Sequence, residues 1–185
     1  MTPATTSSAA GLGEEGHRLQ RFPLRVWREP EVDADIDKVL GRALRDWNTV
    51  FRDALGTSVD AFVRAESKSA ADVIMARARP DSYLAEDIFR GTSVLAYTAF
   101  QSDERGLIRL PVWIYIRPGA ALPKLDRETS VYVVVAHELG HALGLPHTEE
   151  PGSIMYYTRA RRATDVAAAR AQLAEHYTRF WKTTK

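Results

Sequence analysis

The spacing of apolar residues along the chain predicts alternating strands and helices. Leu24-Arg25-Val26-Trp27 alternates as a half-buried strand does, and four later runs are also typical of strands: residues 60–64, 72–76, 93–100 and 110–116. After the first run, apolar residues from Ile36 to Trp47 recur at helical spacing. Asp33 or Asp35 can cap that helix, and Gly56 ends it. The pattern predicts an α+β fold.

The chemistry is concentrated in residues 137–147. His137 and His141 are four residues apart, so on a helix their imidazoles project from one face and can bind one metal ion at ~2.0–2.1 Å. Glu138 points to the flank of that face, where its carboxylate can take a proton from a metal-bound water as a general base. Gly144 allows a sharp turn that returns His147 to the metal. Three neutral nitrogens leave one tetrahedral position open, which indicates a catalytic site.

Two histidines at this spacing also occur on ordinary solvated helix faces. Here, however, three of the five histidines fall within one eleven-residue pattern, and Ser153-Ile154-Met155 follows His147, with the methionine eight residues beyond it. We therefore interpret the pattern as a zinc site. Because the ligands must be neutral, we expect activity to fall as the pH drops through the histidine range.

The residues before the motif, Val131-Tyr132-Val133-Val134-Val135, favour a strand by propensity alone. The zinc motif requires a helix, and Val131, Val134 and Val135 recur at helical spacing ahead of Leu139. We predict a helix that starts near Asp126 or Thr129 and is buried on one face, because packing can stabilise a helix of weak propensity.

These residues resemble the metzincin metallopeptidases, whose long zinc motif is followed by a Met-turn, and among them the matrixins. VVVAHELGHALGLPH is similar to the matrixin active-site helix, the spacing from His147 to Met155 is similar too, and the resemblance extends weakly upstream to about Arg25. It implies a metzincin-like domain: a twisted, mostly parallel sheet of about five strands with one antiparallel edge strand, two long helices beneath it and a C-terminal helix. It also implies that Met155 forms an apolar floor under the histidines without binding zinc.

The resemblance further implies that residues 93–100 form the edge strand above the zinc. Leu95 and Ala96 would then flank an extended peptide substrate that adds to this strand; the alternative is a strand without that role. Matrixins carry histidines in and after this strand for a second, structural zinc. Tyr97 stands where one of them is expected, and the chain has no histidine between His17 and His137. We therefore predict one catalytic Zn²⁺.

Tyr157 lies two residues after the Met-turn methionine. In the astacin and serralysin branches of the metzincins, a tyrosine at this place reaches the zinc or the developing oxyanion, whereas matrixins usually have proline. The resemblance to those branches implies a catalytic phenol that stabilises the tetrahedral intermediate. The alternative is a wall residue of the specificity pocket.

Two further segments have simpler interpretations. Asp81, Glu86 and Asp87 could bind calcium, but they lack the spacing of a known calcium loop, so we favour solvated acids. Thr164 or Asp165 can cap a last helix, which carries an apolar stripe. We expect His176 of this helix to be a core or surface residue rather than a ligand.

Composition limits the remaining possibilities. Residues 1–20 are rich in Thr, Ser, Ala and Gly and predict a disordered leader or a cloning remnant without the features of a signal peptide, followed by one metallopeptidase domain at 21–185. A net charge of +1 with scattered arginines argues against nucleic acid, and no apolar run is long enough to span a membrane. The absence of cysteine excludes disulfides, a thiolate ligand and the cysteine-capped latent state of many matrixins. We expect a monomer; the location is uncertain, although the resemblance suggests the extracellular space.

The sequence thus predicts a zinc-dependent endopeptidase acting on protein or peptide substrates. One alternative is a peptide-binding module that keeps the zinc without useful catalysis, but Glu138 has no purpose in a purely structural site. Another is a narrow processing protease or toxin-like protease that cuts a single partner.

Overall fold

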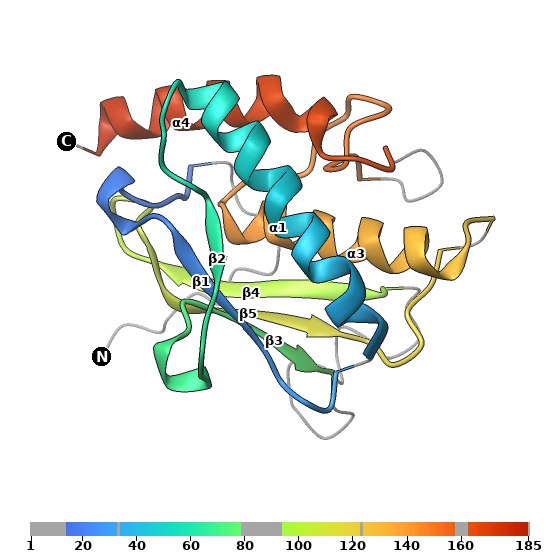
Figure 1. Cartoon of the computed structure of the whole chain (residues 1–185). Coiled ribbons are helices and arrows are strands. Elements are labelled where there is room, and N and C mark those ends of the chain that lie inside the picture. The colour runs from blue at the N-terminus through green and yellow to red at the C-terminus, as the bar shows by residue number, and fades with distance from the viewer. Residues whose placement is uncertain (1–13, 33, 79–93, 123, 158–162, 185) are drawn as a thin grey trace.

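The computed structural model describes residues 14–32, 34–78, 94–122, 124–157 and 163–184. Its centre is a five-stranded sheet in the order β2-β1-β3-β5-β4 (Figure 1). The strands are β1 (Leu24–Arg28), β2 (Phe62–Arg64), β3 (Val73–Arg77), β4 (Ala96–Ser102) and β5 (Ile108–Ile116). All neighbours pair in parallel except β4 and β5, which are antiparallel. The predicted α+β fold, with a mostly parallel sheet and one antiparallel edge strand, is confirmed.

The helices lie on one side of this sheet (Figure 1). They are α1 (Ala34–Leu55), α3 (Arg127–Ala142) and α4 (Arg170–Thr183), and three short 3-10 turns occur at Leu19–Arg21, Lys68–Ala70 and Ala167–Ala169. Helix α3 contacts β4 and β5 as well as α1, and α1 also contacts α4. Helix α3 therefore packs against both the sheet and α1, and α1 itself also contacts β2.

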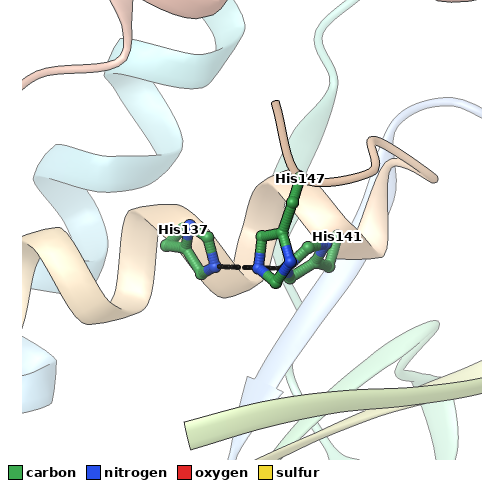
Figure 2. A group of neighbouring side chains, drawn as sticks. All are labelled: His137, His141 and His147. Atoms are coloured by element: carbon green, nitrogen blue, oxygen red, sulfur yellow. Dashed lines mark hydrogen bonds between the residues drawn. The ribbon is translucent and has the colours of Figure 1, made fainter. Parts of the chain in front are cut away.

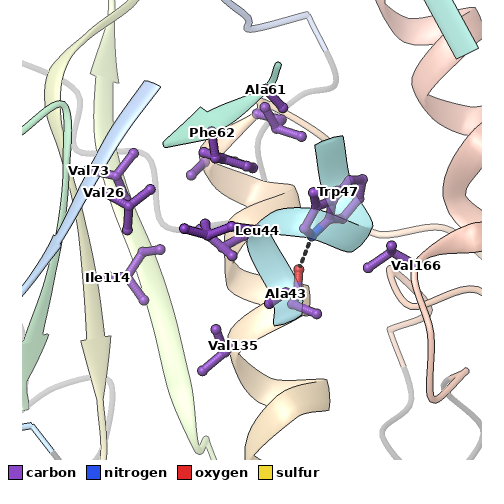
Figure 3. Close-up of a cluster of buried hydrophobic side chains, with 14 of the residues drawn as sticks. Val26, Ala43, Leu44, Trp47, Ala61, Phe62, Val73, Ile114, Val135 and Val166 are labelled. Carbon is purple, nitrogen blue, oxygen red and sulfur yellow. Dashed lines mark hydrogen bonds between the residues drawn. The ribbon is translucent and has the colours of Figure 1, made fainter. Parts of the chain in front are cut away.

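The core fills the space between the sheet and the helices (Figure 3). Ile114 from β5 is completely buried on the same side of the sheet as Leu44 of α1 and Val135 of α3. The side chain of Trp47 is also fully buried, and its Nε1 donates a hydrogen bond to the carbonyl oxygen of Ala136 at 2.9 Å. This bond ties α1 to the middle of α3.

Helix α3 forms despite its run of β-branched residues because it is surrounded by other elements. Every residue from Ser130 to Ala142 is buried. Asp126 caps the helix, with Oδ1 accepting a hydrogen bond from the Thr129 amide at 2.9 Å. The predicted start of the helix is thus confirmed, and burial supplies the stability that valine propensity does not.

Residues 14–17, which we call the amino-terminal strap, pack into the domain. Gly16 pairs with the β4–β5 hairpin: its amide donates to the Gly106 carbonyl, and its carbonyl accepts from the Ile108 amide, both at 3.0 Å. Glu15, Gly16 and His17 are buried. The ordered fold thus begins before residue 21, where the sequence placed the boundary of the leader, because contacts from distant elements bury this polar segment. Residues 1–13 lie outside the described part of the chain.

Several element ends differ from the sequence prediction. Strand β4 begins at Ala96 rather than residue 93, and β5 begins at Ile108 rather than residue 110. The carboxylate of Asp165 accepts a hydrogen bond from the amide of Ala167, the first residue of a 3-10 turn, and α4 itself begins only at Arg170. Within the described residues, no helix has both the length and the apolarity needed to cross a membrane.

Candidate active site

The three histidines of the motif meet at one point (Figure 2). Their Nε2 atoms are 3.1 Å apart between His137 and His141, and 3.2 Å from each of these to His147. Three ligands at ~2.0–2.1 Å from a tetrahedral zinc would lie about 3.3–3.4 Å from one another. His137 and His141 are buried, whereas His147 is exposed at the rim. The cluster fits one zinc ion that is accessible from solvent on one side.

The hydrogen bonds of the histidine rings show which ring nitrogens point to the centre of the cluster, where a metal ion would bind. Nδ1 of His137 donates to the carbonyl of Ile154, and Nδ1 of His141 donates to the carbonyl of Leu145, both at 2.8 Å. A carbonyl only accepts, so each Nδ1 carries the proton and each Nε2 presents a lone pair to the centre of the cluster. Lone pairs crowded at this distance repel each other unless a cation lies between them. The protonation pattern therefore suits a metal site.

The turn after α3 brings the third histidine to this point. Gly144 has a φ of +86°, and a Cβ there would overlap the carbonyl oxygen of Glu15 in the strap. Only glycine accommodates both the left-handed backbone and the close approach. Beyond the turn, Nε2 of Gln172 on α4 donates to the carbonyl of Pro146 at 2.8 Å, next to His147. The amide of Gln172 thus anchors the loop, a contact that sequence reasoning missed.

Glu138, the predicted general base, is only 5% exposed. Its Oε2 lies 2.7 Å from Oγ1 of Thr98 on β4. The sequence analysis did not single out Thr98. The available signal was a threonine between Tyr97 and Ala99 in the predicted strand, but only the placement of β4 against α3 shows which group it meets.

Met155 lies against the underside of the active-site helix. It is completely buried, and a Cβ added at Gly140 would overlap its Sδ and come within 3.0 Å of the Trp47 ring. The residue before it, Ile154, provides the carbonyl that orients His137. This arrangement is what an apolar floor beneath the ligands requires. That Met155 has this role stays a prediction.

The predicted substrate residues lie at the start of the edge strand: Leu95 directly precedes β4, and Ala96 is its first residue. The carbonyl of Leu95 accepts a hydrogen bond from the Arg117 amide, and Ala96 pairs with Ile116 of β5. Tyr97 stacks on Tyr115, and burial, then the neighbouring Tyr115, raises the pKa of Tyr97 to about 12. That the chain binds a single zinc stays a prediction.

The backbone of Tyr157 lies close to His147, but the residue is largely exposed to solvent. Its amide donates to the carbonyl of Thr148, the residue after His147, at 3.3 Å. The residue is 57% exposed, and its ring contacts that of Tyr156 at a tilted angle. Both sequence interpretations of Tyr157, catalytic phenol and pocket wall, therefore remain open.

The remaining candidates are not part of this cluster. In the described part of the chain, the three motif histidines are the group whose side chains are placed to share a metal ion. His176 is buried on α4, and its Nε2 donates to the carbonyl of Glu15, so it is a core residue as expected. The three acids of the predicted solvated loop, at positions 81, 86 and 87, lie outside the described residues.

Comparison with known families agrees with this geometry. A family model described as matrixin matches residues 23–172, from the residue before β1 into α4. The chain belongs to the matrixin family. Matrixins are zinc-dependent metalloendopeptidases, and the match indicates this class of hydrolase for the domain. The histidine cluster accords with the catalytic zinc site of that family.

Three similar curated proteins are collagenases by name. The interstitial collagenase of Sus scrofa is 28% identical over 151 residues, which cover 76% of this chain and 26% of the relative. The 72 kDa type IV collagenase of Gallus gallus is 53% identical over 30 residues, 16% of this chain and 4% of the relative. The neutrophil collagenase of Homo sapiens is 49% identical over 35 residues, which cover 19% of this chain and 8% of the relative. This matrixin domain thus spans about a quarter or less of the length of these relatives.

Proposed function

We propose that this matrixin domain hydrolyses peptide bonds with Glu138 as the general base. The observation that supports this is the convergence of three imidazoles, two of them from α3, and a nearly buried carboxylate on that helix. Because Glu138 directly follows His137, we expect its carboxylate at the flank of the cluster. A structural metal site has no need for a buried acid in that place.

The chemistry divides between the metal and the side chains of the protein. A zinc ion in this cluster would act as a Lewis acid that lowers the pKa of water and polarises the scissile carbonyl. Glu138 removes a proton from the attacking water while the water oxygen bonds to the carbonyl carbon. It then delivers that proton to the amine nitrogen as the C–N bond breaks. One carboxylate thus serves as base and then as acid.

The substrate would lie along the edge of β4 that pairs with no other strand among the described residues. This strand is the last in the sheet order, its far side is paired with β5, and it contacts α3. A peptide can add to such an edge by main-chain hydrogen bonds, with Leu95 and Ala96 beside it. Because main-chain pairing is independent of side chains, the proposed substrate class is an extended peptide segment.

A cleavage assay with a quenched peptide library tests the proposal. The zinc-loaded wild-type domain should cleave, a chelator should stop cleavage, and readded zinc should restore it. Glu138→Ala should keep one zinc per chain and lose at least about 100-fold in kcat. Glu149→Ala, which removes an exposed acid just beyond His147, is the matched control and should retain activity.

The outcomes separate the alternatives. Wild-type activity in Glu138→Ala would reject the general-base assignment. A protein that binds zinc and peptides without cutting any of them would instead be a binding module. Cleavage of one protein in a proteome-wide digest, with no cleavage of the library, would indicate a narrow processing protease.

A further inference from the structure

The hydroxyl of Thr98 points into the interior of the domain. It pairs with Ile114 of β5, whose side chain faces the helices, and Thr98 itself is completely buried. Side chains alternate along a strand, so Thr98 points toward α3 while Tyr97 and Ala99 point to the other face of the sheet. The hydroxyl therefore comes from the same strand that would bind the substrate.

The hydroxyl of Thr98 contacts Glu138 twice. Its Oγ1 lies 2.7 Å from Oε2 of the carboxylate and 3.1 Å from the carbonyl oxygen of the same residue. A hydroxyl has one proton to donate. The carboxylate oxygen is the nearer acceptor and carries the negative charge, which makes the stronger hydrogen bond. The proton is therefore directed to Oε2.

The donor is itself held rigidly. A β-branched side chain has restricted χ1 rotation, and β4 is paired with β5 on both sides of Thr98, at Tyr97 and at Ala99. Glutamate, in contrast, has three side-chain torsions that vary unless a contact fixes them. A fixed donor on the strand thus sets the orientation of a flexible carboxylate on the helix.

We propose that Thr98 is a positioning residue for the general base. By holding Oε2, it orients the carboxylate so that Oε1 is the oxygen that accepts the proton of the attacking water. This inference rests on the proposed function of Glu138 and adds that β4 has two roles: its edge binds the peptide, and its inner face orients the base. A displacement of β4 would then affect both together.

A purely structural role for Thr98 makes a different prediction. The contact with the Glu138 carbonyl also links β4 to α3, and loss of that link would lower stability without changing the chemical step. Positioning predicts a loss of kcat at nearly constant KM, because misplacement of a catalytic group slows the reaction without weakening substrate binding. The two roles are therefore separable by kinetics.

The kinetic test compares Thr98→Val, which keeps the shape and removes the hydroxyl, with Thr98→Ser, which keeps the hydroxyl. We expect Thr98→Val to bind one zinc and to lose about 10- to 100-fold in kcat, with KM changed less than about threefold. Thr98→Ser should recover kcat to within about threefold of wild type. Thr49→Val, which makes the same change at an exposed threonine of α1, is the control and should be unaffected. Wild-type kcat in Thr98→Val, or no recovery in Thr98→Ser, would overturn the proposal.

A double variant links the effect to Glu138. In a Glu138→Ala background, Thr98→Val should cause no further loss of the residual rate, and an additional tenfold loss would show that Thr98 acts elsewhere. If Glu138→Ala is inactive while Thr98→Val is fully active, the positioning role fails and the proposed function stands. If Glu138→Ala is as active as wild type, the general-base role of Glu138 is rejected, and the positioning role of Thr98 is rejected with it.

A crystal structure of Thr98→Val provides a readout that does not depend on activity. The carboxylate of Glu138 should adopt a different rotamer or more than one, whereas it should keep a single orientation in Thr98→Ser. An unchanged, single Glu138 orientation in Thr98→Val would contradict the proposal, whatever the kinetics.

Discussion

His17 donates a hydrogen bond from Nε2 to the carbonyl oxygen of Ala142 at 2.9 Å, across 125 positions of the sequence. Ala142 is the last residue of α3, so this bond satisfies a carbonyl at the end of the active-site helix. The strap is held from the other side as well, because Trp181 Nε1 donates to the carbonyl of His17 at 2.9 Å. The strap thus fastens the helix that carries two zinc ligands.

Replacing His17 should therefore loosen the active-site helix. We expect His17→Ala to lower the free energy of unfolding by roughly 2–4 kcal/mol, since it leaves a cavity and an unpaired buried carbonyl. Urea unfolding of the metal-free protein measures this. Arg18→Ala removes an exposed neighbour and should change stability little. Equal stability of His17→Ala and wild type would show that the strap is not structural.

Two buried histidines should make the stability of the protein fall in acid. Burial is the main cause that lowers the pKa of both His17 and His176 to about 4, from 6.5 in the unfolded chain. Between these values the unfolded chain binds more protons, so stability is fully present above about pH 6.5 and is lost as the pH falls toward 4. The charged groups that also act on these rings are Arg21, Asp72 and Arg179.

The size of this effect can be measured by urea unfolding of the metal-free protein at pH 7, 6 and 5. Each histidine should contribute up to about 3 kcal/mol over the whole range. His17→Gln keeps a hydrogen-bond donor but does not titrate, so it should show a shallower dependence on pH than wild type. A dependence identical to that of wild type would mean that His17 is not held neutral.

Gly140 is expected to tolerate no side chain. Although alanine is a better helix former than glycine by about 1 kcal/mol, a methyl group at this position would overlap Met155. We expect overpacking to outweigh the gain, so that Gly140→Ala loses about 1–3 kcal/mol of stability and binds zinc more weakly. Unfolding curves and competition with a zinc chelator test both effects. Gly41→Ala on α1, where a Cβ meets only flexible arginine side chains at 3.5 Å or more, is the control.

Two variants distinguish the two interpretations of Tyr157, a catalytic phenol and a wall of the specificity pocket. If the phenol donates to the oxyanion, Tyr157→Phe and Tyr157→Leu should both lower kcat, by about tenfold for a donor as exposed as this one. If the ring only forms a pocket wall, Tyr157→Phe should match wild type and Tyr157→Leu should mainly change KM. The first pattern would assign the catalytic role to Tyr157, and unchanged turnover in Tyr157→Phe would remove it.

The sequence predicted those parts of the site that depend on interactions between residues close together in the chain. The spacing of His137 and His141 on a helix and the left-handed turn at Gly144 depend on residues close together in the chain. Helix α3 was predicted in spite of its valines only because the motif required it; propensity alone would have given a strand.

The parts that were missed depend on distant contacts. The role of Thr98 requires knowing which residue of α3 faces β4, and strand periodicity does not give that register. The strap looked like an unstructured leader because its composition is polar, yet Glu15 and His17 are buried by α4 and by the end of α3. Buried polar segments of this kind have no apolar pattern from which they could be predicted.

Helix α4 is synthesised after all three histidines, yet it holds the loop of the third one through Gln172 and Pro146. Because a chain is made from its amino terminus, this contact can form only after α4 has left the ribosome. A nascent chain that stops short of α4 should therefore hold the loop of His147 less firmly than a chain that includes it.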